Sequence, residues 1–223
     1  MGRLIYSMSV SLDGFVETPS RSLDWVQVDE ELHSLFNDEA REMGAFLYGR
    51  RMYQLMVDYW PTAESDPSAT PAMLEFARIW KDKPKIVFSR TLDRVEWNSR
   101  LVRDDAAEEV RRLKAQPGFD MDVGGPTLAS TLVRLGLIDE YHLFVHPVIL
   151  GAGTPFFPAL DDRIGLNLLE TRTFGSGVVY LRYEVLAPQG DARSESADTL
   201  AVPERRTEMP RIVVSEFLTF RPP

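Results

Sequence analysis

Three short segments combine glycine, arginine and hydroxyl side chains in a way that suits a phosphate group. They are Tyr48-Gly49-Arg50-Arg51, Ser89-Arg90-Thr91 and Gly124-Gly125-Pro126-Thr127. Each follows a short apolar run that predicts a β-strand, and the first and third also precede a predicted helix. Glycine lets a phosphate approach the backbone, a helix N-terminus presents free N–H groups, and arginine can bind two oxygens at once. Taken alone, each segment could also be an ordinary turn without a ligand, and its arginines could simply be solvated.

The three turns are expected to lie at one edge of a sheet. In open α/β sheets, ligands bind beyond the carboxyl ends of the parallel strands, so three such ends together favour a phosphate-bearing ligand more than any one does. Asp13 follows another predicted strand. Its carboxyl group could orient a heterocycle or relay a proton, or it could form a local turn with Gly14. The sequence leaves both roles of Asp13 open.

Other catalytic chemistries lack their residues. The chain has no cysteine, which excludes disulfides, thiolate metal sites and cysteine nucleophiles. His142 and His146 lie four residues apart on a predicted strand, which puts them about 13 Å from each other, too far to share a metal ion. His33 stands alone on a predicted helix. No metal site is expected, and neither a serine-hydrolase elbow nor a Walker loop occurs.

Charge and composition narrow the functional class further. The 223 residues carry a formal net charge of -9, with 25 basic against 34 acidic side chains. An acidic surface repels phosphate backbones, so nucleic acid is not an expected partner. No stretch approaches the roughly 18 apolar residues of a membrane-spanning helix, and the N-terminus lacks the core of a signal peptide. A cytoplasmic protein that acts on a small molecule is expected.

The elements that must position these residues alternate along the chain. Strands are expected at residues 3–10, 45–48, 85–89, 95–102, 120–123 and 141–146. Helices are expected at 29–43, 50–59, 71–80 and 104–115, with one more opening at 124–127 and ending before Gly136. Two consecutive strands, 164–174 and 178–186, read as a closing antiparallel hairpin. This order predicts an α/β fold of three layers, with a mostly parallel sheet covered on both faces and an antiparallel C-terminal hairpin.

The composition changes after residue 186. Residues 187–210 are polar with few large apolar side chains, which is typical of a linker. The remaining segment, 211–223, contains an apolar run over 211–220 that predicts an extra strand. Such a strand needs a partner, either an edge of its own sheet or a second subunit, so a homodimer is expected. One domain over residues 1–186 is therefore expected to carry the function.

Six blocks in a fixed order resemble a known family. They are residues 11–16 (Ser-Leu-Asp-Gly-Phe-Val), 47–53 (Leu-Tyr-Gly-Arg-Arg-Met-Tyr), 85–92 (Lys-Ile-Val-Phe-Ser-Arg-Thr-Leu), 124–128 (Gly-Gly-Pro-Thr-Leu), 136–141 (Gly-Leu-Ile-Asp-Glu-Tyr) and 147–157. Over about residues 3–186 the chain resembles stand-alone relatives of the reductase domain of the riboflavin-biosynthesis deaminase/reductase. This RibD C-terminal-domain-like family shares the dihydrofolate reductase fold.

The resemblance implies an NADPH site on the residues already singled out. By position, Gly49, Arg50 and Arg51, with Gly124, Gly125, Pro126 and Thr127, would hold the cofactor's phosphates. Ser89, Arg90 and Thr91 would lie by the adenosine ribose and its 2′-phosphate, and Asp13 would lie in a mobile loop over the nicotinamide. Riboflavin reductases carry a lysine where this chain has Ser7, so the resemblance does not identify the riboflavin intermediate as the substrate.

These observations lead to one main hypothesis and two alternatives. The main hypothesis is an NADPH-dependent reductase that transfers a hydride to a small heterocycle, pterin- or pyrimidine-like, with Asp13 as the candidate proton donor. Tyr6, Met8, Phe15 and Trp25 are candidates for the substrate wall. One alternative is a nucleotide-binding or interaction module of the same fold without turnover. The other, flavin-dependent chemistry, would show as a yellow protein.

Overall fold

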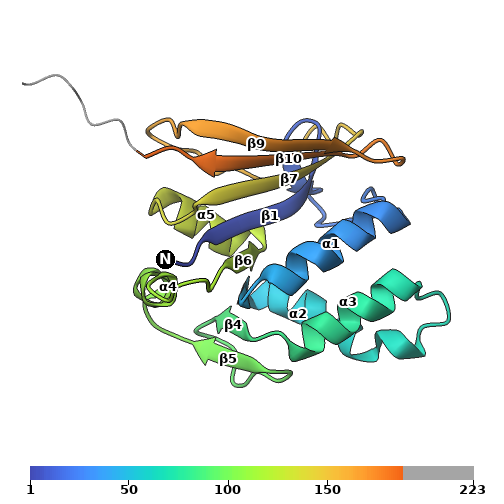
Figure 1. Ribbon diagram of the computed structural model, residues 1–223, viewed down its shortest axis with the longest axis horizontal. Helices are drawn as coiled ribbons and strands as arrows, with labels where there is room; N and C mark the ends of the chain where they lie inside the picture. Colours follow the sequence, from blue (N-terminus) through green and yellow to red (C-terminus); the bar gives the residue numbers. More distant parts are fainter. Residues whose placement is uncertain (188–223) are drawn as a thin grey trace, which may run out of the picture. The chain divides into compact units, whose positions relative to one another are not determined.

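A computed structural model describes residues 1–187, whose main sheet has eight strands and is flanked by helices (Figure 1). The strand order is β5-β4-β3-β6-β1-β7-β10-β9. The bounds of the strands are β1 Leu4–Ser11, β3 Ala45–Gly49, β4 Lys85–Phe88, β5 Ser99–Val102, β6 Met121–Gly124, β7 Glu140–His146, β9 Leu166–Thr173 and β10 Val179–Val185.

The directions of these strands confirm the predicted fold class. The pairs β5–β4, β4–β3, β3–β6, β6–β1 and β1–β7 are parallel, whereas β7–β10 and β10–β9 are antiparallel. Parallel neighbours need crossover connections, which the helices supply, whereas β9 and β10 are joined by the short turn that Gly175-Ser176-Gly177 predicted. The hairpin forms one end of the sheet.

The helices cover the two faces of the sheet in separate groups (Figure 1). Helices α1 (Glu30–Glu42), α2 (Arg50–Tyr59) and α3 (Pro71–Asp82) bury Ala40, Tyr53 and Trp80 in one core cluster. Helices α4 (Ala106–Lys114) and α5 (Pro126–Arg134) contribute Val110 and Leu132 to a different cluster. The sheet therefore separates two cores, as the three-layer prediction requires.

Strand β1 shows how the sequence divides its side chains between these cores. Leu4, Tyr6 and Val10 belong to the cluster with α4 and α5, whereas Ile5 belongs to the cluster with α1 to α3. The period of two follows from the pleat of the strand. All four of these side chains are almost completely buried, so β1 is a central strand with two packed faces.

The ends of two helices differ from the predicted ranges. Asp29 precedes α1 instead of opening it: its carboxylate accepts a hydrogen bond of 2.8 Å from the backbone N–H of Leu32 and so caps the helix. Met43, the last residue of the expected range 29–43, has an extended conformation, so α1 ends at Glu42. The chain was also expected to stop being helical at Trp60, but it continues as a 3₁₀ helix, η1 (Trp60–Ser65), because proline is tolerated in a first turn.

A small second sheet was not predicted. Strand β2 (Phe15–Glu17) pairs antiparallel with β8 (Thr154–Pro155) and joins the loop after β1 to the glycine-rich loop after β7. Most of the expected linker and the expected strand at 211–223 lie outside the described residues. Within residues 1–187, no helix has the length and apolar character to cross a membrane.

Candidate active site

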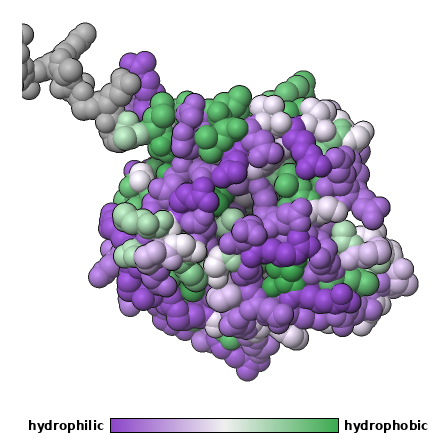
Figure 2. Space-filling model, viewed as in Figure 1, coloured by the Kyte–Doolittle hydropathy of each residue, from purple (hydrophilic) through white to green (hydrophobic). Residues whose placement is uncertain are grey.

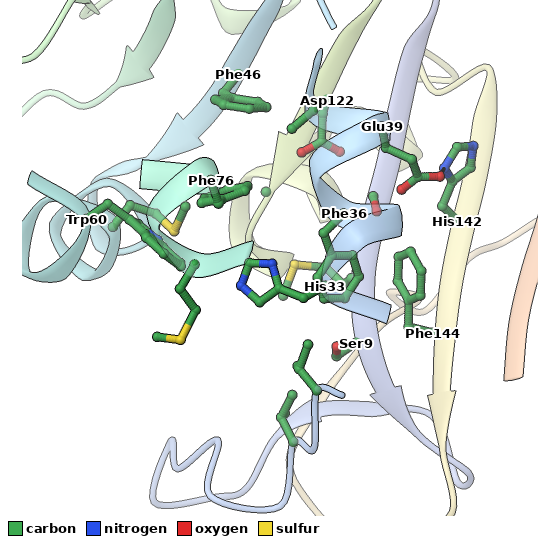
Figure 3. A pocket seen from close by; sticks show the side chains of 18 of the residues that line it. Ser9, His33, Phe36, Glu39, Phe46, Trp60, Phe76, Asp122, His142 and Phe144 are labelled. Atoms are coloured by element: carbon green, nitrogen blue, oxygen red, sulfur yellow. Dashed lines mark ion pairs between the residues drawn. The ribbon is translucent and has the colours of Figure 1, made fainter. Parts of the chain in front are cut away.

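A cavity of about 650 Å³ lies between one face of the sheet and the helices α1 to α3. Its strands are β1, β3, β6 and β7, and it reaches their carboxyl-terminal halves, where Ser9, Tyr48 and Gly124 line it. Most of the wall is apolar or aromatic. The aromatic side chains among them include Phe36, Phe46, Trp60, Phe76 and Phe144 (Figure 3). Tyr48 and several methionines, such as Met52 and Met56, complete this wall. The volume and the apolar lining suit a flat organic molecule.

Asp122 is a polar group that lines this cavity from the sheet. It lies in the middle of β6, and its carboxyl group points toward the space between α1 and the ring of Phe76 (Figure 3). Its Oδ1 atom is shielded from solvent and has no hydrogen-bond partner. Burial, reinforced by the negative charge of Glu39, raises the pKa of Asp122 to about 7. At neutral pH the cavity thus contains a carboxyl group that exchanges a proton readily.

A charged network lies beside Asp122 on the same face. His142 of β7 lies 2.9 Å from Glu39 through Nδ1 and 3.2 Å from Glu140 through Nε2. Tyr180 donates a 2.6 Å hydrogen bond to Glu39, and Arg182 pairs with Glu140 at 2.8 Å. Burial alone would lower the pKa of His142, but its two carboxylate partners outweigh burial and raise that pKa to about 9. His142 is therefore a cation at neutral pH, and both its nitrogens are occupied.

His33 lines the opposite side of the cavity. Its ring lies edge-on to Phe36, Trp60 and Phe76, with centroids 6.2 to 6.4 Å away. Its Nδ1 atom is buried without a partner, and burial lowers its pKa. His33 is therefore a neutral group that can exchange a hydrogen bond with a ligand.

The three turns singled out in the sequence follow neighbouring strands, and two of them reach this cavity through Tyr48 and Gly124. Their strands β4, β3 and β6 are consecutive in the sheet, with Gly49 opposite Phe88 and Tyr48 opposite Gly124. Gly49 begins α2 and Gly125 begins α5, and neither helix start has a side-chain cap. By contrast, side chains cap the starts of α1, α3 and α4. Two uncapped helix N-termini therefore meet at the carboxyl edge of the sheet.

The backbone at Gly124 and Gly125 requires glycine. Gly125 has φ +93°, a conformation that residues with a side chain rarely adopt, and a Cβ there would lie 3.0 Å from the Cβ of Met52. A Cβ at Gly124 would lie 3.0 Å from the ring of Tyr48. The glycines thus let the turn between β6 and α5 pack closely against Tyr48 and Met52. Pro126 and Thr127 form the first turn of that helix.

The arginines of the predicted site point in different directions. Arg50 donates a 3.0 Å hydrogen bond to the hydroxyl of Thr91, while Ser89 accepts from the backbone N–H of Thr91 at 3.2 Å. Arg90 is exposed at the same turn. Arg51 pairs instead with the buried Glu17 of β2 at 2.7 Å. Four of these residues therefore cluster at the ends of β3 and β4, while Arg51 fastens β2 to α2.

Asp13 does not lie in the cavity. It is exposed, and its two carboxylate oxygens accept hydrogen bonds from the backbone N–H groups of Leu150 at 3.0 Å and Gly151 at 2.7 Å. These bonds, the one from Leu150 above all, lower the pKa of Asp13. In this arrangement Asp13 is an ionised carboxylate that holds two loops together, which is the local structural role that the sequence left open for it.

The predicted substrate wall is also revised. Met8 lines the cavity and accepts a 3.5 Å contact from the backbone N–H of Gly125. Tyr6 does not line the cavity: it is buried in the cluster with α4 and α5, stacked on Phe156 with centroids 4.1 Å apart. Phe15 and Trp25 do not line the cavity; Trp25 packs edge-on against His146 instead.

Asp122, Glu39 and His142 were not among the predicted site residues. The available signal was Asp122 itself, since an acid within a short central strand has few partners there and is uncommon unless it has a function. Glu39 and His142 gave no such signal, because their meeting depends on how α1 packs on β7.

Comparison with known proteins identifies the family. The RibD C-terminal domain family matches residues 3–180. The protein YyaP of Bacillus subtilis (strain 168), itself uncharacterized, is 38% identical over 182 residues, which cover 81% of this chain and 94% of YyaP.

Solved structures agree with the fold at low sequence identity. A candidate riboflavin-biosynthesis protein from Shewanella sp. PV-4 superposes with a TM-score of 0.66 at 20% identity, covering 84% of this chain and all of that one. Dihydrofolate reductase from Enterococcus faecalis, in complex with NADP(H), has a TM-score of 0.54 at 14% identity over 82% of this chain and 96% of that one. The chain therefore belongs to the RibD C-terminal domain family and has the dihydrofolate-reductase-like fold.

Proposed function

We propose that the protein is an NADPH-dependent reductase of a small heterocyclic substrate. The observation that carries this proposal is the meeting of two uncapped helix N-termini, at Gly49 and Gly125, beside an apolar cavity. Backbone N–H groups at helix starts bind anions, and the adjacent cavity can take the rings of a nicotinamide and a substrate.

The residues present fit the cofactor. The N-termini of α2 and α5 would hold its two bridging phosphates, since no side chain caps either helix start. Arg50, Ser89, Arg90 and Thr91 offer guanidinium and hydroxyl groups for a 2′-phosphate. Arg51 is paired with Glu17, so it would contribute less to binding the cofactor's phosphates than Arg50 and Arg90 would. When bound, the cofactor supplies the hydride; the protein positions the substrate and excludes water.

Asp122 is the group best suited to handle the proton that accompanies a hydride. It faces the cavity and has a pKa of about 7, so it can give up a proton at neutral pH and recover it. Asp13 lacks both properties, because it lies outside the cavity and hydrogen bonds to its carboxylate lower its pKa. We therefore assign the acid role to Asp122 in this proposal.

Two measurements test the proposal. NADPH should bind to the purified protein and raise its melting temperature, since a ligand at about 100 times its Kd stabilises the folded state by roughly 2.7 kcal/mol. Oxidation of NADPH should then be measured with a panel of pterins and pyrimidines. NADPH binding without oxidation of NADPH by any member would favour the nucleotide-binding module, and a yellow protein stabilised by FMN alone would favour flavin chemistry.

A further inference from the structure

Ser9 is a polar group of the cavity to which the proposed function gives no role. It lies on β1, opposite Phe144 of β7 in the register of the sheet, and it lines the cavity (Figure 3). Among residues 1–187 its hydroxyl has one hydrogen-bond partner, Nε2 of His146 at 3.1 Å. A hydroxyl has one hydrogen to donate, so the direction of this bond decides what Ser9 can offer to a ligand.

The backbone of Gln27 determines that direction. Its N–H donates a 3.5 Å hydrogen bond to Nδ1 of His146. A backbone N–H can only donate, so Nδ1 carries no proton, and burial lowers the pKa of His146, which favours the neutral ring. The single ring proton is therefore on Nε2, and His146 donates to the hydroxyl of Ser9. The hydrogen of that hydroxyl is left without an acceptor in the described part of the chain.

The surroundings of His146 keep the ring in this state. The side chain is 1% exposed and packs edge-on against Trp25, with ring centroids 5.3 Å apart. Gln27 stands between Val26 and Val28, which both line the cavity. A segment of the cavity wall therefore also fixes the position of the proton on His146.

We infer that Ser9 is a specificity residue whose hydroxyl donates a hydrogen bond to a carbonyl oxygen of the substrate, and that His146 is the positioning residue that keeps this hydroxyl a donor. The inference rests on the proposed function for the identity of the cavity as the substrate site. It adds one chemical requirement, which is a ring-bound carbonyl oxygen directed at β1. A C–H group in that place would leave the hydroxyl hydrogen of Ser9 unpaired, which disfavours binding.

The acceptor should carry no net charge. Four acidic side chains line the cavity, whereas no lysine or arginine of the described chain does. The cation His142 is already paired with Glu39 and Glu140. A phosphate or carboxylate beside Ser9 would therefore lose its hydration without gaining a free cation. A carbonyl oxygen accepts the hydrogen bond at no such cost.

The test compares two probes of the same shape. Acetophenone carries a carbonyl oxygen where α-methylstyrene has a CH₂ group. Dissociation constants should be measured by ligand-observed NMR titration for the full-length wild type, for Ser9→Ala, and for Ser34→Ala, a matched change at an exposed serine of α1 outside the cavity. The wild type and Ser34→Ala should bind acetophenone about two- to tenfold more tightly than α-methylstyrene, as expected of a neutral hydrogen bond. Ser9→Ala should lose that preference.

The role of His146 has a spectroscopic readout in the wild type. A two-bond ¹H–¹⁵N spectrum of its imidazole should show a protonated Nε2 and an unprotonated Nδ1, before and after acetophenone is added. The chain has three histidines, so His33→Gln and His142→Gln identify the signals of His146. The opposite tautomer would make Ser9 a donor to His146 and would overturn the inference.

Two binding results would also overturn it. One is a wild type that binds both probes equally or neither of them, and the other is a Ser9→Ala variant that keeps the preference for acetophenone. The titrations should be repeated with saturating NADP⁺, where acetophenone should still bind; its displacement would assign the Ser9 donor to the cofactor instead of the substrate. If NADP⁺ itself does not bind, the proposed function fails, whereas the comparison of the two probes still decides what Ser9 offers to a ligand.

Discussion

The guanidinium group of Arg50 donates a 3.0 Å hydrogen bond to the hydroxyl of Thr91, which joins the start of α2 to the turn after β4. Both Arg50 and Arg90 are exposed, but Arg50 is tied to the turn after β4 by this hydrogen bond. This difference assigns separate roles to two arginines that look alike in the sequence.

Arg90 should discriminate NADPH from NADH. Its guanidinium suits a dianionic 2′-phosphate better than a neutral hydroxyl, and a charge-assisted bond is worth roughly 1.5–3 kcal/mol, or about one to two decades in affinity. Arg90→Ala should weaken NADPH binding by that order and leave NADH nearly unchanged. Fluorescence titration with both nucleotides measures this, with the exposed Arg94→Ala as the control. Equal losses for both nucleotides would instead place Arg90 at the shared phosphates.

Gly125→Ala should weaken cofactor binding and destabilise the fold. The positive φ of Gly125 strains any other residue by about 1–3 kcal/mol, and the new Cβ would press against Met52. For a chain of this size the strain should lower the melting temperature by about 2–4 °C for each kcal/mol. Calorimetry and NADPH titration should be compared with Gly136→Ala. That glycine also has a positive φ (+62°), but its Cβ would have open space.

If the phosphate site is where we propose, only Gly125→Ala should reduce NADPH affinity, although both variants should melt earlier. Equal NADPH affinity in the two variants would separate the α5 N-terminus from cofactor binding.

The parts of the fold that were predicted correctly depend on local patterns. Helix α2 was expected at residues 50–59 and is found there, because apolar spacing and flanking residues determine it locally. Strands β2 and β8 were missed, since segments of three and two residues carry no periodicity and pair across more than 130 positions.

The site shows the same difference between features that follow from local sequence or fold class and features that depend on contacts between distant segments. The three turns could be placed together because parallel strands end at one edge, a rule of the fold class. Asp13 could not be excluded, since its partners Leu150 and Gly151 are distant in sequence. Asp122 could not be placed in a cavity, because the packing of helices α1 to α3 against the sheet creates that cavity.

Residues after Ala187 should be required for assembly into a homodimer. Strand β9 is at the edge of the sheet, and within residues 1–187 no strand pairs with its outer side. Leu168 and Leu169 on β9 are 49% and 43% exposed, and Figure 2 shows apolar atoms gathered beside the last described residues. An open apolar edge strand favours association. Light scattering on a chain that ends at Ala187 should therefore give a smaller mass than the full chain; an unchanged, equally soluble species would show that the segment is dispensable.

The His142 network should stabilise the protein most below neutral pH. The pKa of His142 is raised from the ordinary 6.5 to about 9 in the folded state by Glu140 and Glu39, against the effect of burial. The folded state therefore binds the proton more tightly than the unfolded state does. That contribution is fully present below about pH 6.5 and disappears as pH rises through about 9.

Replacing His142 with glutamine tests this sign. The wild type should exceed His142→Gln in free energy of unfolding by an amount on the order of 2 kcal/mol near pH 6, and the difference should shrink steadily toward pH 9.5. Urea unfolding at intervals of half a pH unit measures it. The control is Arg172→Gln, which removes the exposed ion pair between Arg172 and Glu31 and involves no histidine. Its effect on the free energy of unfolding should not change with pH over this range. A difference between wild type and His142→Gln that stays constant from pH 6 to 9.5 would mean that His142 stabilises the fold by packing rather than by its charge.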